Sequence, residues 1–515
     1  ESLAVQWLEP EQTANKTHPF FFTQCQAIHA RTLVPCQDTP AVKFTYTARV
    51  QVAEPLTALM SAQRVGDVEV VEDGWRAFSF HQPNPIPSYL LAVAAGLLEF
   101  RKLGPRTGVW AEPPVVDAAE HEFAETETFL QEVEGLLGPY DWGTCELLTL
   151  PPSFPYGGME NPNLIFVTPT LLAGDRSLAD VVMHEICHSW TGNLVTCAHW
   201  SCFWMNEGLT MMAQRKALAR YTARTGRTLA GRPFFEFDSA NGMVDLADSV
   251  SHFQHLGMGE FTKLVPNLDG HDPDDAFSKV PYEKGFALLY AIEQEIGDEA
   301  RFERWLKAVV QDHARQSITH WTLTNHLTTF LLEDGGEEIE LGIDWDAWYD
   351  GEGMPSDPLP GASSKVRSAI RTVADLYLEG PSNIPTGALE GWSSTQRVCF
   401  LERLLERADE LAKDGKRFDS ELLRWIGKDT GLATTKNAEE RFRWARVCLR
   451  NGAIEDGLPV AEAILREQGR MKFVRPLFRD LLADADTRPA VDAIWEDRAP
   501  EYHPICSKMV RDDIA

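Results

Sequence analysis

The pattern of apolar and polar residues divides the chain into a strand-rich first part and a helix-rich remainder. Residues 15–100 are rich in Val, Thr, Phe and Tyr, and stretches such as VKFTYTARVQV at 42–52 alternate as half-buried strands do. Prolines precede the longest apolar run, SYLLAVAAGLLEF at 88–100, and favour a buried strand or a short helix there. We therefore expect an antiparallel β domain over residues 1–97.

Helical periodicity begins at about residue 117. The segment DAAEHEFAETETFLQEVEGLL at 117–137 carries acids in its early turns and stops at Gly138, which is typical of a helix. A strand is predicted for ELLTLPP at 146–152, and helices are expected from there to about residue 350. The segment 344–364 is dense in Pro, Gly and Ser, which predicts a linker.

Beyond the linker, residues 365–515 form helical segments of 12 to 18 residues, which suggests antiparallel helix pairs stacked as in a helical repeat. Asn437 followed by Glu440, ahead of RFRWARVCL, predicts a helix start. A chain of 515 residues exceeds a single core. The patterns together predict a multidomain α+β protein.

The charge of the chain restricts its partners. Lys and Arg number 48 against 77 Asp and Glu, which gives a formal net charge of −29. Such a field repels phosphate backbones and anionic lipids, so we expect no nucleic-acid partner, and it favours substrates that carry positive charge. The longest apolar run is too short to cross a bilayer as a helix, so no membrane insertion is expected.

Nine cysteines without CxxC spacing favour a reducing compartment. No signal peptide is visible, so we expect a cytoplasmic protein, with a nuclear pool as an extension of that location. The chain begins at Glu1 rather than at a methionine, and we expect the β domain to be incomplete at this end.

Candidate chemistry is concentrated in VVMHEICHSWTGN at 181–193. Ser177 with Asp180 predicts the start of this helix and Gly192 its end. His184 and His188 lie one turn apart on one face, where two imidazoles can share a zinc ion. Glu185 is rotated about 100° from His184, beside the metal, where it can take a proton from water. The alternative is a core helix whose histidines are satisfied by hydrogen bonds.

A catalytic zinc takes three protein ligands and leaves a fourth position for water. FWMNEGLTMMAQRKALARY at 203–221 predicts the next helix and puts Glu207 near its start, so this residue is the candidate third ligand. A solvated acid at a helix N-terminus is the plain alternative. Cys197, His199 and Cys202 in the intervening loop are alternative ligands whose spacing fits no zinc pattern.

Two further segments bear on a hydrolytic reaction. Glu160, in the glycine-rich GGMEN at 157–161, could bind the α-ammonium of a peptide and make the enzyme an exopeptidase; an exposed turn is the alternative. Tyr282 follows a proline at a helix start and could donate a hydrogen bond to a developing oxyanion; a packing role is the alternative.

These motifs, GGMEN, HEICH, NEGLT and VPYEKGF, in this order and spacing, resemble the gluzincin zinc aminopeptidases. Three longer stretches are similar to the leukotriene A4 hydrolase branch of that family: QCQAIHARTLVPCQDTP at 24–40, LPPSFPYGGMENPNLIFVTPTLLAGDRSL at 150–178 and EQGRMKFVRPLF at 467–478. The resemblance covers essentially the whole chain. It implies an N-terminal β domain at 1–97, a thermolysin-like catalytic domain at 98–343, the linker and a C-terminal all-α domain at 365–515.

The resemblance also implies roles for individual residues. It gives one Zn²⁺ per chain to His184, His188 and Glu207, and it makes Glu185 the general base and Tyr282 the oxyanion donor. The substrate-binding residues that it implies are Gln24, Gln26, Tyr156, Gly157, Gly158, Met159, Glu160, Asp274, Arg470 and Lys472. Among these, Arg470 and Lys472 would bind a carboxylate of a peptide or lipid. The implied function is a monomeric aminopeptidase that acts on short peptides, tripeptides above all, with a basic first residue favoured.

One position departs from the family pattern. Phe277 stands where animal members carry a tyrosine five residues before the catalytic one, and this changes the shape and polarity of the lipid pocket. Peptide hydrolysis needs only Tyr282, and hydrolysis of a fatty-acid epoxide is the alternative, as a second or as the principal activity. A non-enzymatic scaffold with a vestigial zinc site is the remaining alternative.

Overall fold

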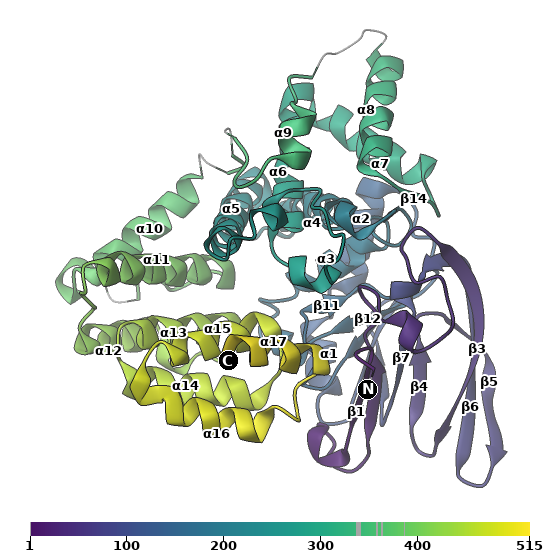
Figure 1. The fold of residues 1–515 in the computed structure, drawn as a ribbon, viewed down its shortest axis with the longest axis horizontal. Coiled ribbons are helices and arrows are strands. Elements are labelled where there is room, and N and C mark those ends of the chain that lie inside the picture. The colour runs from purple at the N-terminus through teal and green to yellow at the C-terminus, as the bar shows by residue number, and fades with distance from the viewer. Residues whose placement is uncertain (1, 336–340, 357–358, 362–363, 386, 515) are drawn as a thin grey trace.

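The computed structural model describes residues 2–514 apart from 336–340, 357–358, 362–363 and 386. The chain forms three blocks: a β-rich N-terminal block, a mixed central block and a helical C-terminal block (Figure 1). The fold is the multidomain α+β architecture that the sequence predicts.

The N-terminal block contains two antiparallel sheets. The four-stranded sheet has the order β1-β2-β7-β4, with bounds Val5–Leu8, Phe20–Thr23, Val93–Gly96 and Thr57–Met60. The three-stranded sheet has the order β3-β6-β5, with bounds Lys43–Ala53, Trp75–Pro87 and Gln63–Glu72. The alternating segment at 42–52 corresponds to β3, which pairs antiparallel with β6 over most of its length.

A five-stranded mixed sheet supports the central block. Its order is β11-β12-β10-β9-β8, with bounds Gly158–Met159, Leu164–Val167, Cys145–Thr149, Thr107–Ala111 and Glu99–Lys102. The predicted boundary at residue 97 falls between β7 and β8, which belong to different sheets. One continuous hydrophobic core nevertheless extends from the four-stranded sheet into the central block. The strand β11, which contains the second glycine and the methionine of the GGMEN motif, is an edge strand.

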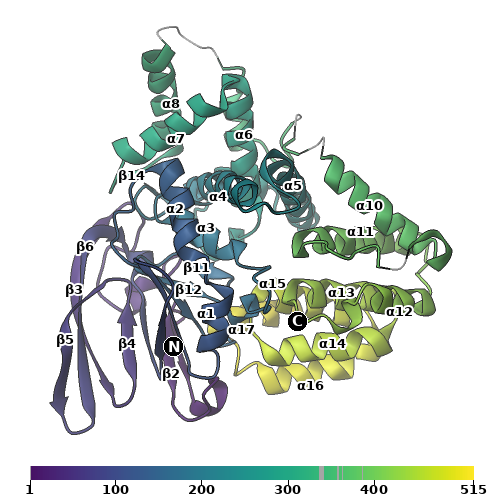
Figure 2. The ribbon, with the colours of Figure 1, turned by 180° about the vertical axis from the view of Figure 1, so that it is seen from behind.

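Helices cover this sheet and carry the chemistry. Their bounds are α1 Val116–Glu122, α2 Thr126–Leu137, α3 Asp180–His188, α4 Trp204–Thr225, α5 Gly231–His255, α6 Gly285–Ile296, α7 Glu299–Asp312, α8 His320–Gly335 and α9 Trp345–Asp350, and the short strands β13 Thr196–Cys197 and β14 Ser317–Ile318 pair beside them. Figure 2 shows α2, α3 and α4 at the centre of the molecule from behind. The helix α4 is buried along most of its length because it packs against α3, α5 and α6.

The C-terminal block is all helical. Its bounds are α10 Lys365–Leu378, α11 Ser394–Lys413, α12 Ser420–Asp429, α13 Ala438–Arg450, α14 Ile454–Glu467, α15 Met471–Leu482, α16 Arg488–Arg498 and α17 Pro504–Ile514. Successive helices pack as pairs, with α13 against both α11 and α14. Asn437 begins α13, since its side chain accepts hydrogen bonds from two backbone N–H groups of the first turn, as predicted.

Three local predictions are wrong. The predicted helix 117–137 is broken into α1 and α2, although it ends before Gly138 as expected. Ser177 does not cap α3: the helix begins after Ala179, and the Ser177 hydroxyl instead accepts a hydrogen bond from Asn437. The predicted linker is not uniformly irregular, because it contains α9, whose Tyr349 is buried in the central core.

Among the described residues, no helix is both long enough and apolar enough to cross a membrane. All nine cysteines have free thiols.

Candidate active site

Two consecutive helices bring the three predicted metal ligands together. The Nε2 atoms of His184 and His188, both on α3, lie 3.1 Å apart. Glu207, in the first turn of α4, places its Oε2 atom 3.4 Å from Nε2 of His184 and 3.3 Å from Nε2 of His188. The three ligand atoms therefore converge on one point.

A hydrogen bond at Nδ1 fixes the orientation of each imidazole ring and directs Nε2 towards the other ligands. Nδ1 of His188 donates to the Thr191 carbonyl at 2.8 Å, and Nδ1 of His184 donates to Oε1 of Gln214 at 2.9 Å. With each Nδ1 engaged on the outer side of the ring, both Nε2 atoms face the ligand atoms of the triad, and the buried Oε2 of Glu207 has no hydrogen-bond partner. Such an arrangement is repulsive unless a cation lies between the three atoms. Two imidazoles, one carboxylate and an open fourth position are the donor set of a catalytic zinc site.

Two further buried carboxylates adjoin the triad. Ligand atoms of Glu160 and Glu185 lie within 4.8 Å of each other and of His188. Burial alone lowers the pKa of the His188 imidazole, but the carboxylates of Glu207 and Glu160 outweigh burial and raise this pKa to about 10. The site therefore attracts positive charge, both a metal ion and the ammonium of a substrate.

Tyr282 faces the triad from a π-helical turn, Val280–Lys284, and its ring stacks on His184 with centroids 6.0 Å apart. Buried charges hold this turn on both sides. The carboxylate of Glu283 forms a bidentate pair with Arg215 of α4, at 2.8 and 3.0 Å. The ammonium of Lys284 donates to three backbone carbonyl oxygens. The turn is thus tied to the helix that carries Glu207.

Glycines permit two close approaches at the site. A Cβ atom at Gly158 would lie 2.3 Å from Oε1 of Glu185, so the edge strand β11 passes directly over this carboxylate. A Cβ atom at Gly208, next to Glu207, would lie 2.8 Å from the backbone of Gly285. The helices α4 and α6 therefore touch backbone to backbone beside the metal ligand.

Comparison with known proteins gives matches along the chain. Three family descriptions match: "Peptidase M1 N-terminal domain" at residues 9–90, "Peptidase family M1 domain" at 122–348 and "Leukotriene A4 hydrolase, C-terminal" at 392–514. Leukotriene A-4 hydrolase of Xenopus laevis is 43% identical over the whole chain and 82% of its own length. The chain belongs to the peptidase M1 family. Leucine aminopeptidase 2 of Aspergillus fumigatus is 38% identical over 99% of the chain and 80% of its own length.

A solved structure extends this likeness to three dimensions. Yeast LTA4 hydrolase in complex with bestatin superposes with a TM-score of 0.90 at 34% identity, over all of the chain and 81% of the yeast protein. This M1 protein is thus a hydrolase of the zinc aminopeptidase class with the three-domain architecture of LTA4 hydrolase. Membership of the M1 family implies zinc, and the donor set described above fits it.

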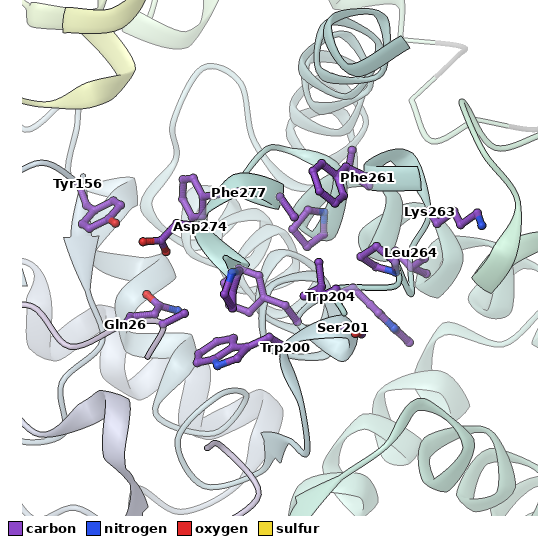
Figure 3. Close-up of a pocket in the computed structure, with 18 residues that line it drawn as sticks. Gln26, Tyr156, Trp200, Ser201, Trp204, Phe261, Lys263, Leu264, Asp274 and Phe277 are labelled. Atoms are coloured by element: carbon purple, nitrogen blue, oxygen red, sulfur yellow. The ribbon is translucent and has the colours of Figure 1, made fainter. Parts of the chain in front are cut away.

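An apolar pocket of the M1 protein lies beside Tyr282, and several predicted substrate residues line it (Figure 3). Gln26, Tyr156 and Asp274 gather at one end of the pocket, and the ring of Phe277 contacts the rings of both Tyr156 and Tyr282. The other lining side chains are mainly apolar, among them Trp200, Phe203, Trp204, Phe261 and Leu264. The pocket is therefore an apolar recess that adjoins Tyr282 through the ring of Phe277.

The remaining predicted residues occupy two other places. Gln24 is buried and donates from Nε2 to the sulfur of Met159 in β11. Arg470 lies against Gly157, where a Cβ atom would be 2.6 Å from Nη2, and its Nη1 donates to Thr170. Lys472 lies in the first turn of α15, two residues after Arg470, and pairs with a carboxylate of α13.

The alternative ligands do not join the triad. The thiol of Cys202 contacts Nε2 of His199 at 3.4 Å and Nδ1 of His320 at 3.1 Å. In the described part of the chain, the groupings with converging ligand atoms include neither of these loop residues nor Cys197.

The sequence prediction missed the residues that orient the imidazoles. Gln214 lies seven residues after Glu207, two turns along α4 on the same face, and this spacing was the available signal. Thr191 acts through its backbone carbonyl, for which a sequence carries no signal.

Proposed function

We propose that this M1 enzyme holds one zinc ion per chain with His184, His188 and Glu207, and that it removes N-terminal residues from short peptides. Tripeptides with a basic first residue are the proposed preferred substrates. The observation that carries this proposal is the convergence of two imidazole nitrogens and an unpartnered buried carboxylate oxygen, with Glu160 and Glu185 beside them.

The residues around the triad supply the steps of the reaction. When bound, zinc polarises the scissile carbonyl and acidifies a water molecule. The Glu185 carboxylate accepts a proton from the attacking water and returns it to the departing amine. The Tyr282 hydroxyl donates a hydrogen bond to the carbonyl oxygen as negative charge develops there. Each role is supported by a position within or directly beside the converging groups.

Two charged groups define the ends of the substrate. The buried Glu160 carboxylate receives the α-ammonium, which restricts cleavage to the first peptide bond. Arg470 and Lys472 bind the C-terminal carboxylate of the peptide, so the distance between the two ends favours a short substrate. Asp274, at the polar end of the pocket, favours a basic first side chain, with Gln24, Gln26, Tyr156 and the backbone of Gly157, Gly158 and Met159 lining the path.

Hydrolysis of an arginyl arylamide and of an arginyl tripeptide tests this function. We expect both reactions to stop in a chelator and to return when one equivalent of zinc is added per chain. Hydrolysis at full rate after complete removal of the metal, measured by elemental analysis, would refute the proposal.

Fatty-acid epoxide hydrolysis is a second candidate function, which the apolar pocket beside Tyr282 favours. The relative in Xenopus laevis is named leukotriene A-4 hydrolase. Incubation with an allylic fatty-acid epoxide should yield a diol whose formation depends on the enzyme, and the absence of such a diol would exclude this second function.

We further propose that the enzyme is a monomer and lies in the cytoplasm, with a second pool in the nucleus. The nine free thiols support a reducing compartment. Light scattering of the purified protein and fractionation of cells test the two statements.

A further inference from the structure

A carboxylate that no motif marks lies among the cations of the proposed C-terminal subsite. Glu439, the second residue of α13, is 8% exposed. Its Oε1 lies 2.8 Å from Nζ of Lys472 and 3.5 Å from Nη1 of Arg470, and its Oε2 lies 2.7 Å from Nη1 of Arg443. Both oxygens of Glu439 are therefore engaged, and three positive side chains converge on one negative one.

The backbone around these groups is fixed to the central block. Asn437, which caps α13, donates to the Ser177 hydroxyl just ahead of the metal-binding helix α3. On the other side, the N–H of Gly469 donates to the Pro152 carbonyl at 2.7 Å. The segments that carry Glu439 and Arg470 are thus both anchored to the parts of the chain that lead into the zinc site.

We propose that Glu439 is a positioning residue, which holds Lys472 and Arg470 in the orientation that recognises the C-terminal carboxylate of a peptide. This proposal rests on the proposed aminopeptidase function. It goes beyond that function in one respect. The preference for a free peptide acid over the matching amide depends on Glu439, which does not contact the substrate.

The charge of Glu439 excludes a direct binding role, because two carboxylates repel each other. Burial alone would raise the pKa of this carboxyl group, but Lys472, Arg443 and Arg470 outweigh burial and hold it far below its usual range. Glu439 is therefore ionised wherever the enzyme works.

Lys472 depends on this anchor more than Arg470 does. The Lys472 side chain is 41% exposed, and Glu439 is the carboxylate that holds it. Arg470 retains the Thr170 hydroxyl as a second partner, and its buried Nε has none. Without Glu439 the Lys472 ammonium would turn into solvent, and Arg470 would lose its ionic partner. The subsite would then offer one loosely held donor, Arg470, in place of two oriented donors.

The test compares the tripeptide Arg-Ala-Ala with its C-terminal amide, and uses an arginyl arylamide as a substrate without a peptide C-terminus. In Glu439→Gln we expect the ratio of kcat/KM for the acid to kcat/KM for the amide to fall about tenfold, mainly through KM. Glu439→Asp keeps the charge one methylene further back and should give an intermediate ratio. Glu439→Asp also provides the test if Glu439→Gln folds poorly.

The matched control is Glu402→Gln. Glu402 pairs with Arg443 at 3.0 Å on the far side of the same network and forms no ion pair with Arg470 or Lys472. The substitution removes a second carboxylate that pairs with Arg443, so the acid-to-amide ratio should stay at the wild-type value. In a Lys472→Met background, Glu439→Gln should change the ratio less than it does in the wild-type background, because the part of the effect that acts through Lys472 is already lost.

The outcomes separate the positioning role from the function. An equal loss on acid, amide and arylamide in Glu439→Gln, or an unchanged ratio, overturns the positioning role and leaves the aminopeptidase assignment intact. Failure of the wild-type enzyme to cleave any of the three substrates overturns the function itself. If the acid-to-amide ratio falls as much in Glu402→Gln as in Glu439→Gln, net charge rather than position matters. This result also refutes the proposal.

Discussion

The proposed zinc site and the proposed carboxylate subsite are assembled differently. His184, His188 and Glu207 come from two consecutive helices, and the imidazoles are oriented by hydrogen bonds that they donate to Gln214 and to a backbone carbonyl. Arg470 and Lys472 come from the C-terminal helices, and an ionic network centred on one carboxylate orients them.

This difference predicts two kinds of failure. A change at the zinc site removes the reaction for every substrate, because each substrate uses the same zinc, base and oxyanion donor. A change at the carboxylate subsite alters the choice between substrates, because only those with a free carboxylate use it.

The largest expected effect is that of Glu185→Gln. The amide retains the size of the side chain but cannot accept a proton, so kcat should fall by about 10³ for peptide acid, peptide amide and arylamide alike. Zinc content, measured by elemental analysis, should stay at one per chain. Retained turnover would remove Glu185 from its role as the base.

Tyr282→Phe comes next. Loss of one oxyanion donor should lower kcat by about 10² and leave KM nearly unchanged, since the hydroxyl acts mainly in the transition state. Steady-state kinetics on the arylamide measure this split. A rise in KM at constant kcat would assign Tyr282 to substrate packing instead.

Gln214→Leu tests the orientation of the zinc ligands. Loss of the acceptor for Nδ1 of His184 should weaken zinc binding by about 10-fold to 100-fold, as measured by competition with a chromogenic chelator. Gln214→Glu keeps an acceptor at this position and is the control. Equal zinc affinity in the two variants would contradict a role in fixing the imidazole.

Arg470→Lys has the smallest expected effect. The lysine keeps the charge but loses the planar fork of the guanidinium, so the ratio of peptide-acid to arylamide kcat/KM should fall about tenfold. The same fall on both substrates would place Arg470 in the structure of the site rather than in carboxylate recognition.

The same difference decides what could be predicted from the sequence. The zinc ligands, the base and their helices follow from a spacing of four residues on one helix and from a carboxylate at the start of the next. Strand alternation gave the β domain, and Pro and Gly content gave most of the linker. The resemblance supplied Arg470 and Lys472, which no local pattern marks.

Other features depend on tertiary contacts. The break between α1 and α2 carries neither proline nor glycine, and α9 inside the linker owes its place to the burial of Tyr349. Glu439 looks like an ordinary acid in the first turn of a helix, where the dipole favours it. Its position among three cations appears only when α13 packs against α15 within the C-terminal block.

The contact between Gly208 and Gly285 restricts how the substrate range of this enzyme can change. Two helices that already touch through their backbones can move no closer, and any added side chain would push Glu207 away from the imidazoles. The width of the reaction centre is therefore fixed by main-chain atoms. New substrates must be accommodated by exchanging side chains around this rigid frame, such as Phe277, rather than by shifting the helices that form it.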